Sequence, residues 1–307
     1  MKSDGMSSAG SEETEILWQK LFQKEQDSEL SVIGYSDGIM KVKRTIETSN
    51  GQELEHAIRD NVAMTFLESD VDNAVDEAKN HHSNFVMKKK VNSIMRMLKH
   101  SSGDESLLID LGCGFGWHWV EAARENSRFR FLLVDFSLNN LLVARKLMPF
   151  DRYPNVLCLQ SDILHLPIIS HMADFIWSVQ VMQHLPQDKR KRTLNEMKRI
   201  GKPLCRFYIA WIRSVPLIEL IYSILRRKYH KKGILSSGMF FQRYDREVEE
   251  EFNNLFSVKK SYSEGLFHPE LRLISKNNLV GIIDDLICST FLGYLCARQI
   301  EIWGTMK

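Results

Sequence analysis

A glycine-rich stretch with one carboxylate is the part of this sequence best suited to hold a ligand. Residues 107–116 read LLIDLGCGFG, an apolar run that leads through Asp110 into Gly112, Gly114 and Gly116. Glycine tolerates a positive φ and lets the backbone approach a ligand closely, because it has no Cβ. The pattern predicts a buried strand followed by a ligand-binding turn at the strand's carboxyl end. A tight turn that holds no ligand is the alternative.

Two more carboxylates stand where apolar runs end. Asp135 closes the run 131–135, which reads FLLVD, and Asp162 lies just beyond the run 156–159. A carboxylate at the end of the second strand can accept hydrogen bonds from both hydroxyls of a ribose. Asp135 or the neighbouring Ser137 is also suited to cap the next helix, and the two roles are compatible. An aspartate after a strand is otherwise a common turn residue.

Three side chains near these turns are candidates for acid–base chemistry or substrate contact. His184 is the first candidate for a general base, because imidazole titrates near physiological pH. Gln183, beside it, is expected to face a substrate. His118 lies between Trp117 and Trp119, just after the glycine turn, and is a third candidate. The alternative for both histidines is structural, with a ring that packs without touching a ligand.

These candidates need a scaffold that alternates strands with helices. From Ser106 to about Arg213, short apolar runs alternate with stretches whose apolar residues recur every three or four positions. The predicted strands are 107–111, 129–134, 156–159, 175–179 and 207–211, and the predicted helices are 117–125, 139–147 and 189–200. Such alternation is typical of a parallel sheet with helices on both faces. Two further strands, 256–262 and 297–303, are expected to close one edge.

Pattern and composition divide the chain into five regions. We interpret 1–13 as a disordered tail, 14–103 as a mainly helical N-terminal extension, 104–213 as the ligand-binding core, 214–255 as a helical lid or insertion, and 256–307 as C-terminal strands that complete the sheet. The insertion is expected to begin with an amphipathic helix that ends in a basic run near 228–232. A solvated helix end is the favoured interpretation of that run, and a binding patch is the alternative.

The bulk composition excludes several classes of protein. Among 307 residues, 41 lysines and arginines face 39 aspartates and glutamates, so no strong field or other signature favours nucleic acid. The five cysteines form no CxxC pair, and we expect no metal site and no disulfide framework. No membrane span is predicted, because the apolar stretch 279–296 contains Asp284 and Asp285. With no secretory signal, the expected location is cytoplasmic; the oligomeric state stays open.

The glycine-rich stretch resembles the first motif of the class I S-adenosylmethionine-dependent methyltransferases. Residues 110–116 fit that family's [D/E]xGxGxG pattern. The dinucleotide pattern GxGxxG fits poorly, because Trp117 stands where its last glycine would be.

Three further motifs follow in the family's order. Residues 135–145 resemble DxSxxxLxxAR, the segment around Asp162 resembles GDAxxLP, and residues 173–185 resemble FDxVxSxxxxxHL. In the stretch 194–205, five residues fit LxExxRxLKPGG, whereas Leu204 and Cys205 replace its two glycines; the five are Leu194, Glu196, Arg199, Lys202 and Pro203. That departure puts the turn geometry before the fifth strand in question, but not the cofactor site.

The resemblance covers about 106–211 and implies an α/β fold with a Rossmann-like, seven-stranded methyltransferase sheet and S-adenosyl-L-methionine as cofactor. It implies Asp135 on the ribose, Asp162 on the adenine amino group and Ile163 on the purine. The cofactor-binding residues expected from it are Asp110, Gly112, Cys113, Gly114, Gly116, Asp135, Phe136, Asp162, Ile163 and Gln180.

The expected activity is transfer of a methyl group to an O, N or C nucleophile of a small molecule. An RNA or tRNA base methyltransferase is one alternative, disfavoured by the near-neutral charge and the lack of an appended RNA-binding motif. A non-catalytic protein that binds S-adenosylmethionine is another, disfavoured by the intact glycine turn. Aromatic residues outside the core, among them Phe240, Phe241 and Tyr244 with Arg243 between them, are expected to help form the substrate pocket.

Overall fold

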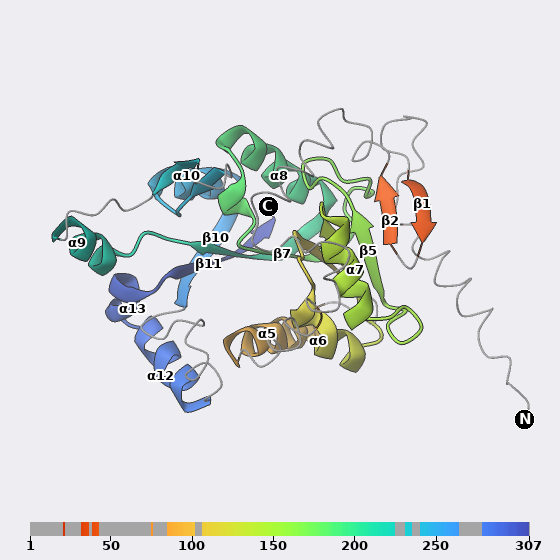
Figure 1. The fold of residues 1–307 in the computed structure, drawn as a ribbon, viewed down its shortest axis with the longest axis horizontal. Helices are drawn as coiled ribbons and strands as arrows, with labels where there is room; N and C mark the ends of the chain where they lie inside the picture. The colour runs from red at the N-terminus through yellow and green to blue at the C-terminus, as the bar shows by residue number, and fades with distance from the viewer. Residues whose placement is uncertain are drawn as a thin grey trace, which may run out of the picture.

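The main sheet has nine strands in the order β1-β2-β5-β4-β3-β6-β7-β11-β10, and a separate hairpin pairs β8 with β9 (Figure 1). The strands are β1 Val32–Ser36, β2 Ile39–Val42, β3 Leu107–Leu111, β4 Arg130–Asp135, β5 Val156–Gln160, β6 Ala173–Val179, β7 Gly201–Ile212, β8 Lys232–Ile234, β9 Phe240–Gln242, β10 Phe256–Ser263 and β11 Gln299–Met306. This computed structural model describes residues 21, 32–36, 39–42, 75, 85–101, 106–224, 231–234, 240–263 and 278–306.

The strands from β2 to β7 in the sheet order run parallel, whereas β11 is antiparallel to both β7 and β10. Every residue of β3 and β5 is buried, as expected for strands covered on both faces. Because parallel strands end at the same edge, the turns after β3, β4, β5 and β6 all lie along one edge of the sheet, the carboxyl edge. The glycine turn and both candidate carboxylates follow strands of this set.

The seven predicted strands are present as β3, β4, β5, β6, β7, β10 and β11. The prediction of seven was nevertheless two short, because the hairpin β1–β2 extends the sheet beside β5. This hairpin comes from the region 14–103, which was expected to be mainly helical. Its sequence signal is Asp37-Gly38 between two apolar runs, a pairing typical of tight β-hairpins.

Helices cover both faces of the sheet (Figure 1). The helices α8 and α10 bury Leu194, Met197 and Phe252 against one face, and α5, α6 and α7 cover the other face. The helices are α5 Phe85–Ser101, α6 Val120–Glu125, α7 Leu138–Leu147, α8 Gln187–Ile200, α9 Pro216–Ile224, α10 Arg246–Leu255, α12 Asn278–Cys288 and α13 Phe291–Cys296, with short 3-10 turns η2 Trp117–Trp119 and η3 Met182–His184.

The structure differs from the sequence-based expectation at two places. The predicted helix 117–125 is divided into η2 and α6. At the departure from the family's glycine pair, Leu204 itself takes the left-handed conformation with φ 65°, and its side chain is 76% exposed. A leucine therefore holds a backbone shape that glycine adopts without strain.

The proposed lid 214–255 contains α9, the hairpin β8–β9 and α10, so it is mixed rather than purely helical in its described parts. The tail 1–13 and residues 225–230 of the linker after α9 lie outside the described residues. Among the described helices, none has both the length and the apolar character needed to cross a bilayer.

Candidate functional site

The glycine turn at the carboxyl edge is shaped by three left-handed residues. Gly112, Gly114 and Gly116 have φ of 73°, 54° and 58°. A Cβ on Gly112 would lie 2.3 Å from a methyl carbon of Val181, and one on Gly116 would lie 2.8 Å from Leu133. A Cβ on Gly114 would meet nothing within 4 Å. Packing thus requires two of the glycines, whereas the third borders open space.

Asp135 joins the end of β4 to this turn. Its carboxylate accepts hydrogen bonds from the backbone N–H of Gly114 and of Ser137, each at 2.8 Å, and from the Asn140 side chain at 3.2 Å. The hydroxyl of Ser137, rather than Asp135, caps α7 by accepting from the N–H of Asn140. Burial raises the pKa of Asp135 to about 6, against the lowering effect of these hydrogen bonds. The carboxylate is therefore held against the glycine turn at a desolvation cost.

The residues expected around an adenine follow β4 and β5. Asp162 is partly exposed, and its Oδ1 accepts from the N–H of Leu164 at 3.0 Å. Ile163 is 8% exposed and belongs to the core on the α8 face. Phe136 is partly exposed, and its carbonyl accepts from the Gln160 side chain at 3.2 Å. These residues lie beside Asp135, since the N–H of Ser161 donates to the carbonyl of Asp135.

Asp110 has a different geometry from the other carboxylates. It is 1% exposed, and its Oδ2 accepts from Trp119 Nε1 at 2.8 Å and contacts His118 Nε2 at 3.0 Å. The His118 ring also packs against Trp117, Trp119 and Trp177. Asp110 therefore orients the 3-10 turn after the glycines, and His118 is held by packing and by a carboxylate.

Asp110 is also the first residue of a row that crosses four strands in register. Trp177, Tyr208 and Trp303 follow it on β6, β7 and β11. Trp177 stacks on Tyr208 with ring centroids 4.3 Å apart, and Trp303 packs edge-on against Tyr208 at 4.6 Å. Sequence reasoning missed this row, because the in-register pairing of distant strands leaves no local pattern.

Cys113 lies within the glycine turn and is buried. Burial and the nearby carboxylates of Asp135 and Asp110 raise the pKa of its thiol well above the usual range. The thiol is therefore neutral and a poor nucleophile at physiological pH. Within the described residues, no three His, Cys, Asp or Glu side chains gather as a metal ion would require.

His184 and Gln183 are both engaged in contacts within the protein. His184 Nδ1 lies 3.1 Å from the carbonyl of Phe240, and Nε2 lies 3.1 Å from Gln183 Nε2. Since a carbonyl only accepts, Nδ1 carries the proton, and Nε2 accepts from Gln183. Gln183 Oε1 in turn accepts from the N–H of Ile212, and Gln183 is 3% exposed. Burial lowers the pKa of His184, so this pair connects η3 to β7 and β9 as a neutral unit.

Gln180 follows the last residue of β6 and has a left-handed conformation, with φ 58°. Its N–H donates to the carbonyl of Ala210, and its side chain donates to Gln299 Oε1 at 3.2 Å. Gln299 is 1% exposed and lies at the start of β11, so both residues lie at the carboxyl edge. The Nε2 atom of Gln299 is buried and has no hydrogen-bond acceptor in the described part of the chain.

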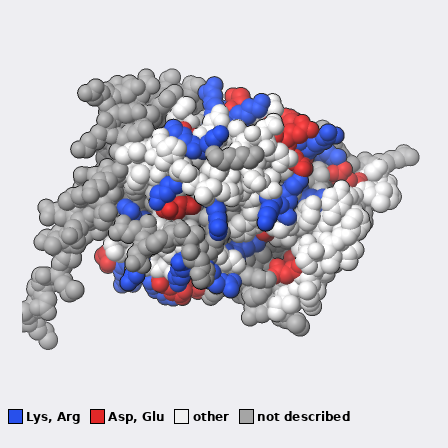
Figure 2. All heavy atoms as spheres, turned by 180° about the vertical axis from the view of Figure 1, so that it is seen from behind, with Lys and Arg blue, Asp and Glu red and all other residues white. Residues whose placement is uncertain are grey.

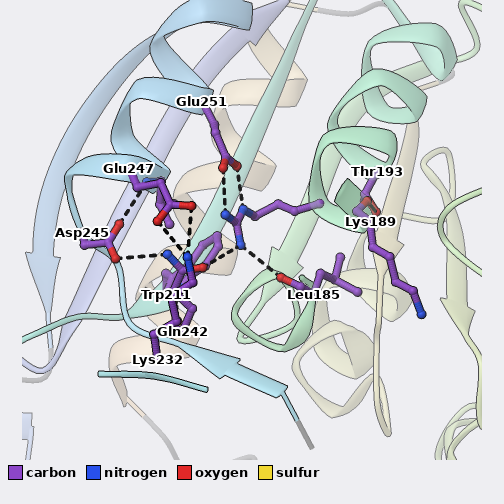
Figure 3. Close-up of polar contacts among 11 residues, drawn as sticks. Leu185, Lys189, Thr193, Trp211, Lys232, Gln242, Asp245, Glu247 and Glu251 are labelled. Atoms are coloured by element: carbon purple, nitrogen blue, oxygen red, sulfur yellow. Dashed lines mark hydrogen bonds and ion pairs between the residues drawn. The ribbon is translucent and has the colours of Figure 1, made fainter. Parts of the chain in front are cut away.

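A buried ion pair fixes the insertion to the core (Figure 3). Arg190 of α8 is fully buried and donates to both carboxylate oxygens of Glu251 on α10, at 2.6 and 2.8 Å. It also donates to Gln242 Oε1, and Gln242 donates to Asp245, the N-cap of α10. Trp211 donates to the carbonyl of Gln242 and lies under the guanidinium. Sequence analysis did not single out Arg190 or Glu251.

The glycine turn belongs to a stretch that matches a known family. Residues 108–204 match the family described as a methyltransferase domain. No curated protein sequence matches the chain. Among solved structures, the chain is similar to one in the complex between the Haloferax volcanii Trm112 methyltransferase activator and a putative methyltransferase. That likeness has 17% identity and a TM-score of 0.50, and covers 78% of this chain and 99% of the other.

The chain also has a weaker likeness to two other solved structures. A SAM-dependent methyltransferase from Aquifex aeolicus has 15% identity and a TM-score of 0.47, over 79% of this chain and 100% of that one. The Haemonchus contortus phosphoethanolamine N-methyltransferase 2, solved with S-adenosyl-L-methionine, has 15% identity and a TM-score of 0.47, over 71% and 52%.

The fold and the matched stretch agree with the motif order predicted from the sequence. The parallel strands β3, β4, β5 and β6 lie within or overlap residues 108–204, and the glycine turn connects the first of them to the helices that follow. The chain is therefore an enzyme with a methyltransferase domain in residues 108–204, and the motifs of that stretch resemble those of the class I S-adenosylmethionine-dependent methyltransferases.

Proposed function

We propose that this enzyme methylates an O, N or C nucleophile of a small molecule, with S-adenosylmethionine bound over the glycine turn. The observation that carries the cofactor assignment is the open space at Gly114 beside the Asp135 carboxylate. A ligand can approach the backbone there, whereas the Cβ directions at Gly112 and Gly116 point into protein. The sulfonium of the cofactor supplies an activated methyl group, and the nucleophile displaces it.

In this proposal Asp135 accepts from the ribose hydroxyls and Asp162 from the adenine amino group. Asp135 is already oriented by the N–H groups of Gly114 and Ser137, so little order is lost when a ligand arrives. Gly112, Gly114, Gly116, Cys113 and Gln180 contribute backbone around the methionine part. Asp110 acts indirectly, by holding Trp119 and His118.

Positioning, rather than a dedicated base, is proposed to supply most of the rate. Methyl transfer from a sulfonium needs an aligned nucleophile and forms no covalent link to the enzyme. His184 and His118 are each held by a hydrogen bond to another group of the chain. We therefore assign these histidines, with Gln183, to positioning. The near-neutral charge of the chain supports a small molecule over RNA.

The test is Asp135→Asn, with S-adenosylhomocysteine binding measured by calorimetry from pH 5 to pH 8. Loss of the charge on the ribose acceptor should weaken binding at pH 7 at least about tenfold. In the parent protein, affinity should fall as the pH drops through about 6, where Asp135 takes up a proton. In the variant this pH dependence should vanish.

The stability of the ligand-free protein provides the control. Since the pKa of Asp135 is raised in the folded state, its contribution to stability is greatest below 3.8 and is lost as the pH rises through about 6. Asp135→Asn should remove this pH dependence of stability, at the cost of one hydrogen bond, because its amide nitrogen then faces the backbone N–H of Gly114 or of Ser137. Unchanged affinity with an intact fold would contradict the ribose assignment.

A further inference from the structure

One buried amide at the carboxyl edge has a hydrogen-bond donor that is not used. Gln299 is 1% exposed, and its Oε1 accepts from the side chain of Gln180 at 3.2 Å. Its Nε2 is buried as well, yet within the described residues it meets no acceptor. A buried donor without an acceptor is rare in folded proteins, because it has lost its hydrogen bonds to water and gained none in return. Such an atom indicates a missing partner.

Gln299 lies on the same face and the same edge of the sheet as the glycine turn. Side chains alternate between the two faces along a strand, so Gln299 shares a face of β11 with Trp303. Trp303 packs against the core beneath α5 and α6, and that core includes Cys113 of the glycine turn. Gln180 follows β6, the strand beside β3, and reaches across to Gln299. A ligand on the glycine turn and one at Gln299 would therefore lie along one edge, with Gln180 between them.

The surroundings of Gln299 are polar although they are buried. Gln299 pairs in register with Ser263, the last residue of β10, and the Ser263 hydroxyl accepts from Lys90 of α5 at 3.1 Å. Lys90 also forms an ion pair with Glu301, two residues along β11. Ser263 and Glu301 are 4% and 5% exposed. Burying so many polar groups costs free energy that an apolar edge would not cost, whereas a binding site needs a few polar groups in fixed positions.

The charges beside Gln299 cancel. The positive charge of Lys90 is matched by Glu301, and the two glutamines are neutral. On the face of the molecule seen in Figure 2, lysines and arginines are interspersed with aspartates and glutamates, so the described surface there does not favour an anion. A donor in neutral surroundings suits a neutral acceptor. A carbonyl oxygen accepts hydrogen bonds without bringing a charge that burial would disfavour.

We propose that Gln299 donates a hydrogen bond to a neutral carbonyl oxygen of the methyl-acceptor substrate, such as that of an amide, an ester or a ketone. The inference rests on the proposed function and adds a substrate class to it. Gln180 is partly exposed, so a ligand reaches the buried Gln299 from the Gln180 side. The bond from Gln180 occupies Oε1 and leaves Nε2 for the ligand. A carbonyl there satisfies the buried donor and holds the substrate beside the cofactor.

The first measurement is the thermal stability of Gln299→Met without any ligand. Methionine has a similar length and no donor, so the variant loses the unused N–H. Gln180 loses its acceptor but is uncharged and partly exposed, and water can replace that acceptor. The midpoint of thermal unfolding should therefore be no lower than that of the parent. Gln187→Met, at an exposed glutamine that begins α8, is the matched control.

The second measurement titrates N-methylacetamide, a minimal neutral carbonyl compound, into the complex of the parent protein with S-adenosylhomocysteine. Nuclear magnetic resonance of the isotope-labelled protein should show a saturable shift of the Gln299 side-chain amide signals, which are identified by their absence in Gln299→Met. Half-saturation is expected at roughly millimolar concentration, because the probe has few atoms. Acetate at matched ionic strength should bind at least about tenfold more weakly, since its charge would have to be buried.

Three outcomes would overturn the proposal. A lower unfolding midpoint for Gln299→Met, with Gln187→Met unchanged, would mean that the amide contributes to the fold. Gln299 signals that do not move with N-methylacetamide, or that respond more strongly to acetate, would exclude the neutral carbonyl. Calorimetry with S-adenosylhomocysteine should give equal affinities for Gln299→Met and the parent, and a loss in the variant alone would place Gln299 on the cofactor. A parent that binds no S-adenosylhomocysteine would contradict the cofactor assignment instead.

Discussion

The two halves of the sheet hold their site residues in different ways. In the glycine-turn half, formed by β3, β4 and β5, the carboxylates are held by backbone N–H groups. Asp162 accepts from an N–H two residues away, and Asp135 accepts from N–H groups 2 and 21 residues away. In the insertion half, formed by β6, β7, β11 and the segment 214–255, the partners are side chains far apart in sequence. Gln180 and Gln299 are separated by 119 positions, and Arg190 and Glu251 by 61. The first half is built from local turns and the second from long-range pairs.

Because of this difference, the two halves should differ in their sensitivity to substitution. A backbone N–H survives any substitution except proline, so the carboxylates of the glycine-turn half tolerate changes in their neighbours. A buried side-chain pair fails as soon as one member is removed, because the other is left charged and desolvated. Stability should therefore respond most to changes in the insertion half, and cofactor binding to changes in the glycine turn.

The largest effect is expected at the buried ion pair. Arg190→Met leaves the Glu251 carboxylate without its partner and should lower the free energy of unfolding by about 3–5 kcal/mol. Urea denaturation measures this loss. The double variant with Glu251→Leu should recover most of it, whereas Arg246→Ala, in an exposed pair with Glu250, should change little. If Arg190→Met were as stable as the parent, the predicted difference in stability effects between the two halves would be contradicted.

A pair of glycine variants should separate packing from ligand binding within the glycine turn. Gly112→Ala brings a Cβ to 2.3 Å from Val181 at φ 73° and should cost about 2–4 kcal/mol of stability. Gly114→Ala meets no atom, so it should cost only about 1 kcal/mol of backbone strain. Its Cβ points into the open space, however, and should weaken S-adenosylhomocysteine binding at least about tenfold. Thermal unfolding and calorimetry would measure the two effects.

The reverse pattern for these glycines would be decisive. If Gly114→Ala kept full affinity, the space beside Gly114 would not be the ligand's position. If Gly112→Ala were as stable as the parent, a Cβ at position 112 would fit beside Val181, contrary to the packing described above.

The smallest effect is expected at Leu204, on the far edge of the insertion half. Leu204→Gly relieves a left-handed leucine but gives the unfolded chain more freedom, so the net gain should be only about 0.5 kcal/mol. Little apolar contact is lost, since the side chain is 76% exposed. A small rise in the midpoint of thermal unfolding would be the sign of this gain. A clear fall would mean that the leucine contributes packing that outweighs the strain.

The same contrast explains what could be predicted from the sequence. The seven strands and the glycine turn were predictable, because burial on both faces and positive φ leave local traces in residue type and spacing. The pair Arg190–Glu251 and the row from Asp110 to Trp303 were not, because pairing between distant strands determines them. The hairpin β1–β2 was missed for a different reason. Its signal, Asp37-Gly38, was present but lay in a region that we interpreted by helical periodicity.

The position of β11 in the sheet affects how the chain can fold during its synthesis. β11 is the latest strand in chain order, yet it lies between β7 and β10 and pairs with both. During synthesis from the amino end, β7 and β10 therefore emerge from the ribosome with edges that have no partner until residues 299–306 follow. The methyltransferase domain can collapse early, whereas the pairing of β7 and β10 with β11 can form only after residues 299–306 have emerged. A nascent chain arrested before β11 should bind chaperones through those open edges, and release should coincide with the emergence of that strand.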